Sequence, residues 1–214
     1  MPRITVVTGH TPGEWDAVAA ITLPGLLAYC DRHRYDLMDV PLVQYAERRP
    51  ASWGKLPALT QALRGSDVAV WIDTDAVMYP DAPPIHEALT PDAWHALVVH
   101  ETPEGTVPGC GVWAVTRAML PVLRLAWSDY RDHRWWEQAA MHRLMGFDPD
   151  ALPVCQILDT VVWRHTVLLD QLWSVLPGED VWGPYMRHAP GGRSMVMREA
   201  MLREWAREAE AVSA

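Results

Sequence analysis

The run from Val68 to Ile72, followed by Asp73 and Asp75, is the feature that most constrains the fold of this chain. Five consecutive apolar residues are too few for a typical helix and are rich in β-formers, so they predict a strand buried on both faces. Open α/β sheets bind ligands at the carboxyl ends of such strands. The two carboxylates just beyond this strand can turn towards one point, where a divalent cation would relieve their repulsion. A solvated turn explains the same pair equally well, because Asp is common after strands.

The composition predicts one globular domain spanning residues 1–214, with 50% hydrophobic and 21% charged residues. A net charge of -9 argues against broad attachment to nucleic acid or to an anionic membrane, and favours a small or neutral substrate. Cys30, Cys110 and Cys155 lie far apart, so we expect reduced thiols and not a disulfide or zinc framework. Since no leader and no membrane-spanning run is evident, we expect a cytoplasmic protein without a membrane partner.

Along the chain, hydrophobic periodicity predicts alternating strands and helices. The predicted strands are residues 4–7, 35–40, 68–72, 95–101, 111–116 and 185–188, with short extended segments over 167–176. The predicted helices are residues 14–34, a short one ending near 64–65, 117–130, 135–146 and a last one marked by Met197, Met201 and Trp205. Residues 79–84 and 102–110 read as loops because they are rich in proline or glycine. The opening β-α-β unit is typical of a parallel sheet.

Three further segments suggest binding functions, each with a plain structural alternative. Thr8 and Gly9 open a turn that can lie against a nucleotide, although no Gly-x-Gly-x-x-Gly or Walker pattern is present and a simple connection fits as well. Lys55 is the only lysine, which suggests a compact ammonium for phosphate or sugar hydroxyls, whereas a surface lysine kept by chance is the alternative.

The third segment is the start of the helix at residues 135–146. Trp135 and Trp136, followed by Glu137 and Gln138, predict either a sugar platform with hydrogen-bonding groups or a packed helix terminus. Near the C-terminus, the turn over residues 189–193 offers backbone amides and one guanidinium to a diphosphate.

In their order and spacing, five blocks resemble metal-dependent glycosyltransferases with the GT-A fold, especially the retaining galactosyl-, mannosyl- and xylosyltransferase family. The blocks are residues 53–59, 70–76, 109–113, 136–140 and 188–192, which together span most of the chain. The resemblance implies an α/β, Rossmann-like mixed sheet flanked by helices. It also implies transfer of a sugar from a nucleoside-diphosphate sugar to a hydroxyl acceptor, with retention of configuration.

The resemblance assigns roles to residues that match the family's motifs. Asp75 and His188 would be direct ligands of a manganese or magnesium ion that bridges the donor diphosphate, with Asp73 near the ribose and metal. Glu137 and Gln138 would lie beside the anomeric carbon. The remaining assignments are contacts with the donor, by Thr8, Gly9, Lys55, Gly191, Gly192 and Arg193. The family usually carries Asn-x-Gly where this chain has Gly109-Cys110-Gly111, which leaves one donor-sugar hydrogen bond without its usual residue.

Two other functions and several acceptors stay open from the sequence. Residues 73–77 also match the Asp-x-Asp-x-(Thr/Val) strand end of haloacid dehalogenase-type phosphatases, although a β-α-β unit precedes the motif and no lysine follows it. A non-catalytic sugar-nucleotide binding protein is the second alternative.

For the donor we expect a uridine diphosphate sugar. The second choice is a guanosine diphosphate sugar, for which Asp16 or Asp36 would supply a carboxylate to the base. The acceptor is a glycan, a natural product, a protein side chain or a hydroxylated DNA base, and the acidic balance favours a small or glycan acceptor.

Overall fold

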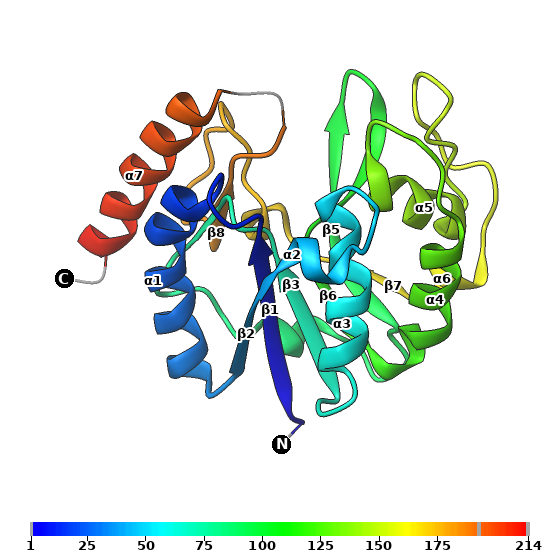
Figure 1. Cartoon of the computed structure of the whole chain (residues 1–214), viewed down its shortest axis with the longest axis horizontal. Helices are drawn as coiled ribbons and strands as arrows, with labels where there is room; N and C mark the ends of the chain where they lie inside the picture. The colour runs from blue at the N-terminus through cyan, green and yellow to red at the C-terminus, as the bar shows by residue number, and fades with distance from the viewer. Residues whose placement is uncertain (1, 192–193, 213–214) are drawn as a thin grey trace.

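A mixed six-stranded sheet forms the centre of the computed structural model, which describes residues 2–191 and 194–212 (Figure 1). Its strand order is β2-β1-β3-β6-β5-β7. The strands are β1 (Ile4–His10), β2 (Asp36–Pro41), β3 (Val68–Ile72), β5 (His95–Thr102), β6 (Gly105–Thr116) and β7 (Thr166–Leu168). Within this sheet β6 runs antiparallel to β3 and β5, and the other pairs are parallel. The predicted mixed sheet is therefore confirmed.

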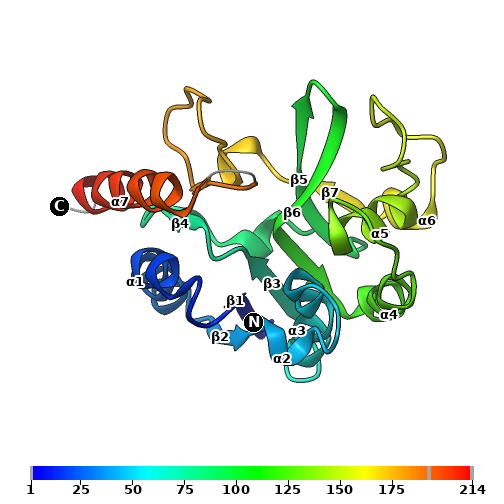
Figure 2. The same ribbon diagram turned by 45° about the horizontal axis from the view of Figure 1, so that its top comes forward.

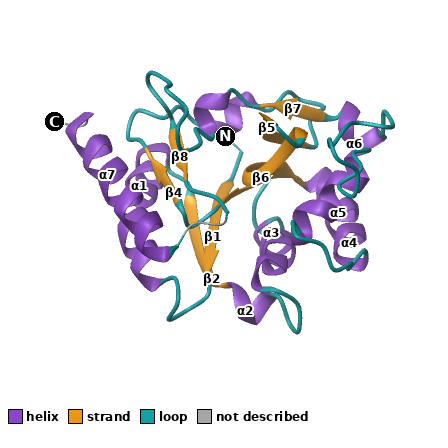
Figure 3. Ribbon diagram, turned by 90° about the horizontal axis from the view of Figure 1, so that it is seen from above, coloured by secondary structure: helices purple, strands orange, loops and turns teal. Residues whose placement is uncertain are grey.

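Helices cover both faces of this sheet, as the view from above shows (Figure 3). On one face lie α3 (Lys55–Ala62), α4 (Leu120–Ser128) and α5 (Trp136–Met145). On the other side, α1 (Asp16–His33) and α7 (Met195–Val212) pack against each other and against the small sheet of β4 (Ala76–Met78) and β8 (Met186–His188). The short helical pieces are α2 (Leu42–Tyr45), α6 (Val161–Arg164), η1 (Ala51–Gly54), η2 (Ile85–Ala88), η3 (Arg117–Met119) and η4 (Gln171–Trp173). None of the helices in the described ranges combines the length and apolar character needed to cross a bilayer.

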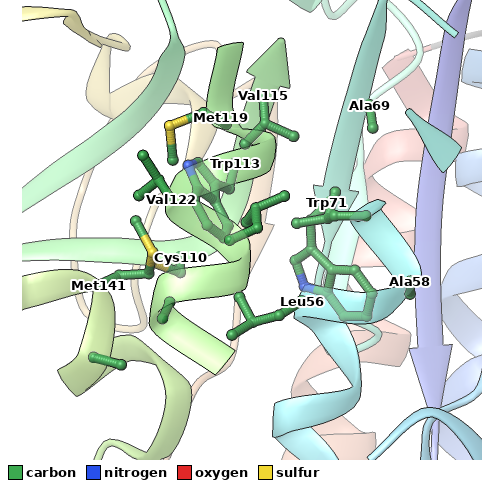
Figure 4. Packing of buried hydrophobic residues seen from close by; sticks show 14 of the residues in the cluster. Leu56, Ala58, Ala69, Trp71, Cys110, Trp113, Val115, Met119, Val122 and Met141 are labelled. Carbon is green, nitrogen blue, oxygen red and sulfur yellow. The ribbon is translucent and has the colours of Figure 1, made fainter. Parts of the chain in front are cut away.

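The side chains of β3 alternate between two hydrophobic cores, which is why the whole strand is apolar. Ala69 and Trp71 belong to the core beneath α3 and α4, and Figure 4 shows Trp71 beside Leu56 and Ala58 of α3. Val70 and its neighbours two positions away join the opposite core, which includes residues of α1. Burial on both faces fixes the strand, and so fixes the place where its polar end emerges.

The prediction of a loop over residues 102–110 is wrong. Most of this segment belongs to β6, which forms a hairpin with β5 that extends out of the sheet (Figure 2). The register shifts within the pair, since Leu97 lies opposite Trp113 but Val98 lies opposite Gly109, so residues 110–112 form a bulge. Glycine and proline in a strand often mark such a bulge, and here they were misread as a break.

Other differences concern the ends of elements. The predicted extended segment 167–176 contains a 3-10 turn, because the Asp170 side chain accepts a hydrogen bond from the backbone amide of Leu172 and caps it. The predicted helix 117–130 begins as a 3-10 turn and ends at Ser128. The unpredicted strand β4 pairs antiparallel with β8, and Ala76 lies opposite His188. This pairing brings the end of β8 to the end of β3.

One buried histidine predicts how stability depends on pH. Trp113 donates a hydrogen bond from Nε1 to Nδ1 of His95, so the ring proton of His95 belongs on Nε2, 2.8 Å from the Thr166 hydroxyl. Burial lowers the pKa of His95 to about 4, whereas an unfolded histidine titrates near 6.5. Between these values the unfolded chain binds more protons. The free energy of unfolding should therefore fall as the pH falls from about 6.5 towards 4.

Urea unfolding at pH 7.5 and pH 5.0 tests this expectation. Between pH 7.5 and pH 5.0, the free energy of unfolding should fall by about 2 kcal/mol more in the wild type than in the His95→Gln variant. This variant keeps an acceptor for Trp113 but cannot be protonated. His165→Gln, altered at a partly exposed histidine, is the matched control and should behave as the wild type does. An equal loss in wild type and His95→Gln would contradict the assignment.

Candidate active site

A cleft of about 930 Å³ opens where β1 and β3 end. Its walls come from the turn after β1, the end of β3, the β5–β6 hairpin, the start of α5 and the segment around β8. The predicted site residues that line it are Gly9, Lys55, Asp73, Asp75, Glu137, Gln138, His188 and Gly191. The carboxyl edge of the sheet thus gathers residues from segments that are far apart in the sequence, as expected for this class of fold.

Asp73, Asp75 and His188 form a cluster suited to a divalent cation. One possible ligand atom from each lies within 4.8 Å of the other two. The His188 Nε2 atom is 3.5 Å from Asp73 Oδ2 and 3.3 Å from Asp75 Oδ1. Neighbouring ligands in an octahedral manganese or magnesium site are about 3 Å apart, so small shifts would bring all three atoms onto one ion.

The environment of the His188 ring is a second reason to consider a metal ion at this cluster. Its Nε2 atom is buried, yet it makes no geometrically acceptable hydrogen bond to the described residues. Burial opposes a charge on this ring, but Asp75 and Asp73 outweigh that effect and raise the pKa of His188 to about 9. A nitrogen held between two carboxylates without a hydrogen bond fits a metal ligand better than a structural histidine.

Gly111 has no side chain, and this leaves room for the cluster of Asp73, Asp75 and His188. A Cβ atom at this position would lie 2.3 Å from Cε1 of His188 and 3.1 Å from Oδ2 of Asp73. The Gly111 carbonyl also accepts a hydrogen bond of 2.8 Å from the Asp73 amide. The bulge in β6 therefore supplies a close backbone contact that only glycine permits. An isolated glycine inside a strand is the sequence signal for such an approach.

Lys55 is not a surface lysine. Its ammonium lies 3.1 Å from Asp73 Oδ1 and 3.0 Å from Glu137 Oε1, and it donates to the Cys110 carbonyl at 2.9 Å. Burial favours the neutral amine, but the two carboxylates outweigh it and raise the pKa of Lys55 above its usual range. An ammonium has three hydrogens, and three acceptors use them. Lys55 thus holds the two carboxylates in place, and the predicted direct contact with the donor would require it to release one of them.

Glu137 and Gln138 stand at the start of α5. One Glu137 oxygen pairs with Lys55, while the other, Oε2, is buried without a hydrogen bond to the described residues. Burial raises the pKa of Glu137 above its ordinary value, although the Lys55 ammonium opposes this. Gln138 accepts only a long hydrogen bond of 3.4 Å from the Cys110 amide. Both side chains therefore retain hydrogen-bonding capacity at the cleft.

Arg198 of α7 was not predicted as a site residue. Its Nε atom lies 3.2 Å from Asp75 Oδ2, and its guanidinium donates to the carbonyls of Ala189 and Gly191. Arg198 and Lys55 thus each hold one oxygen of an aspartate, and the other oxygen of each aspartate faces His188. The sequence gives no local signal for the pairing of Arg198 with Asp75, because the two residues lie far apart along the chain.

Some predicted residues lie elsewhere. Thr8 does not line the cleft, because the alternation of β1 turns its side chain towards Thr74, 3.5 Å away between the hydroxyls. Its expected contact with the nucleotide stays a prediction, which now concerns its backbone, while the next residue, Gly9, does line the cleft. Asp36 stands at the first position of β2, at the opposite edge of the sheet, where it pairs with Arg3. The predicted contacts of Gly192 and Arg193 lie outside the described residues.

Comparison with known proteins relates this geometry to a fold. No protein-family model matches the chain, and no curated protein matches it either. Among solved structures, a glycosyltransferase involved in the glycosylation of the major capsid of PBCV-1 aligns over 95% of this chain and 100% of its own, with 21% identity and a TM-score of 0.70. The galactosyltransferase LgtC, solved with donor and acceptor sugar analogues, aligns over 95% of each chain with 10% identity and a TM-score of 0.63.

A third structure, the glycosyltransferase GlyE of Streptococcus pneumoniae TIGR4, shares 9% identity over 95% of this chain and 60% of its own, with a TM-score of 0.64. At such identities the likeness is one of fold, and it extends over nearly the whole chain. It confirms the fold that the ordered sequence blocks implied. The chain has the GT-A fold, which it shares with these glycosyltransferases.

Proposed function

We propose that this protein is a metal-dependent glycosyltransferase that moves a sugar from a uridine diphosphate sugar to a hydroxyl acceptor with retention of configuration. The observation that carries the proposal is the cluster of Asp73, Asp75 and His188, joined through Lys55 to Glu137 in one cleft. The donor and acceptor analogues of LgtC belong to that protein, and they support sugar transfer for the shared fold.

Charge development at the broken bond explains the residues present. Cleavage of a sugar-phosphate bond leaves negative charge on the diphosphate and positive charge on the sugar ring. A bound manganese or magnesium ion would act as a Lewis acid on the diphosphate oxygens. Asp73, Asp75 and His188 would hold that ion, and the Gly191 turn, fixed by Arg198, would face the phosphates.

Glu137 and Gln138 would act on the sugar side of the bond. The carboxylate of Glu137 and the carboxamide of Gln138, which both line the cleft, would stabilise positive charge on the ring as the phosphate leaves. Lys55 keeps Glu137 fixed during this step. If the acceptor hydroxyl attacks the face that the phosphate leaves, the departing phosphate oxygen takes its proton, and no dedicated base is required.

His100 would supply the donor-sugar hydrogen bond that the family gives to Asn. The chain has Gly109 at that position, and a Cβ atom there would lie 3.3 Å from the His100 Nε2 atom. The ring of His100, from the neighbouring strand, therefore covers the position and lines the cleft. A neutral imidazole both donates and accepts hydrogen bonds, which suits a sugar hydroxyl.

The two alternative functions, a phosphatase of the haloacid dehalogenase type and a non-catalytic sugar-nucleotide binding protein, are less well supported. In a phosphatase the first aspartate must be free to attack, yet Lys55 and the Trp71 indole both hold Oδ1 of Asp73. The motif also lies on the third strand of the chain. A non-catalytic binding protein would have no use for the buried, unpaired oxygen of Glu137, which is costly to maintain.

The first prediction concerns the metal. Asp75→Ala and His188→Ala should each weaken the binding of uridine diphosphate in the presence of manganese at least tenfold, because each removes a ligand atom from the cluster. Calorimetry with and without a chelator measures this directly. His165→Ala, which lies outside the cleft, is the matched control. Unchanged nucleotide affinity in the presence of the chelator would refute metal dependence.

The second prediction concerns turnover. Gln138→Ala should lower kcat by about 10- to 1000-fold with little change in the donor KM, because the carboxamide would contact charge that develops only in the transition state. Steady-state kinetics of donor hydrolysis with manganese separate the two constants. A raised donor KM with normal kcat would show that Gln138 serves donor binding instead.

The third prediction concerns the base. Of the two carboxylates considered for a guanine, Asp36 is remote and Asp16 already pairs with His10 at 3.1 Å. Thermal-shift titration with manganese should therefore show greater stabilisation by uridine diphosphate than by guanosine diphosphate at equal concentration. The opposite order would assign a guanosine donor.

A further inference from the structure

Trp136 is a half-exposed aromatic residue at the wall of the cleft. It immediately precedes Glu137, and 50% of its surface is accessible. Its neighbour Trp135 differs, because it packs on the main core and makes edge contacts with the rings of His133 and His142. Both tryptophans line the cleft, but Trp135 is partly buried against the core, and Trp136 is the more exposed of the two.

The backbone at Trp136 adopts a conformation that disfavours its own side chain. Its φ angle is 45°, in the left-handed region, where a bulky residue is rare. The turn is fixed by hydrogen bonds, from the Trp136 amide to the His133 carbonyl at 3.0 Å and from the Trp135 amide to His133 Nδ1 at 3.0 Å. Glycine would adopt this angle without strain. The strained angle costs folding free energy, and half of the Trp136 surface stays in solvent, so we take a bound molecule as the explanation for both.

The surroundings of the indole favour one chemical class. On the same turn, the Arg134 guanidinium pairs with Glu104 of the opposite hairpin at 3.1 Å, and both side chains remain substantially exposed. Thr102 and Arg134 line the cleft as well. A cleft that offers an exposed aromatic ring together with hydrogen-bonding groups matches a pyranose, which has an apolar C–H face and polar edges. The net charge of -9 disfavours a nucleic acid in the same place.

We propose that Trp136 is the platform on which the acceptor stacks, and that the acceptor is a carbohydrate. This inference rests on the proposed function, because it places the acceptor hydroxyl beside the reacting centre at Glu137. The rigid turn presents the indole before the acceptor arrives, so binding orders no side chain there. The platform thereby narrows the open acceptor classes to sugars.

Kinetics with matched variants test the platform. With manganese, the nucleotide sugar that the wild type hydrolyses fastest, and methyl pyranosides, lactose and maltose as acceptors, Trp136→Gly should lower the ratio of transfer to donor hydrolysis at least tenfold. Trp136→Phe should retain part of that ratio. The melting temperature of Trp136→Gly should not fall, because glycine relieves the strain. Trp182→Ala, at a fully exposed tryptophan outside the cleft lining, is the control and should leave the ratio unchanged.

A direct binding measurement identifies the class of acceptor. In protein labelled with 5-fluorotryptophan, the ¹⁹F resonance absent from Trp136→Phe should shift on addition of these saccharides. A shift only with p-nitrophenol or a short oligonucleotide would overturn the carbohydrate assignment, and so would an unchanged ratio in Trp136→Gly. If the wild type neither binds uridine diphosphate with manganese nor hydrolyses any nucleotide sugar, the proposed function fails, and a saccharide-induced shift would still establish Trp136 as a sugar platform.

Discussion

The buried ammonium of Lys55 is the interaction on which the site depends. It joins Asp73 at the end of β3, Glu137 at the start of α5 and the Cys110 carbonyl in the bulge of β6. Without it, two carboxylates would share a poorly solvated space and repel each other, and one of them would become protonated. The position of Glu137 relative to Asp73 is therefore set by one side chain, that of the only lysine in the chain.

Two features of the backbone, the bulge in β6 and the pairing of β4 with β8, bring separate segments together at the site. The bulge at residues 110–112 of β6 directs Gly111 towards the ends of β3 and β8, and the absence of a side chain there admits the His188 ring. The pairing of Ala76 with His188 then brings the His188 ring to the two aspartates. Each of these two features is local. Together they assemble a site from residues that are more than a hundred positions apart in the sequence.

The sequence predicted the parts of the molecule that depend on local patterns. The run at Val68–Ile72 has the composition of a doubly buried strand, and the structure confirms the strand and the mixed sheet around it. Asp73, Asp75 and His188 could be named because they belong to ordered blocks, and the structure brings them together. The β5–β6 hairpin was missed, because its glycines and prolines serve a register shift that depends on pairing with a distant strand. The inward side chain of Thr8 and the role of Arg198 were missed for the same reason, since each is defined by a long-range contact.

The two carboxylate oxygens of Asp73, and likewise those of Asp75, have different partners, and this fixes the orientation of both side chains. Lys55 holds Oδ1 of Asp73, Arg198 holds Oδ2 of Asp75, and the remaining oxygen of each faces Nε2 of His188. Two buried cations thus orient two carboxylates before any metal ion binds, which is the usual work of groups behind the ligands in a metal site. Because Arg198 also holds the carbonyls of Ala189 and Gly191, the same guanidinium couples the cluster to the turn that would face the phosphates. One residue of the last helix therefore links Asp75 to the turn at Gly191, which are the proposed metal-binding and phosphate-binding parts of the cleft.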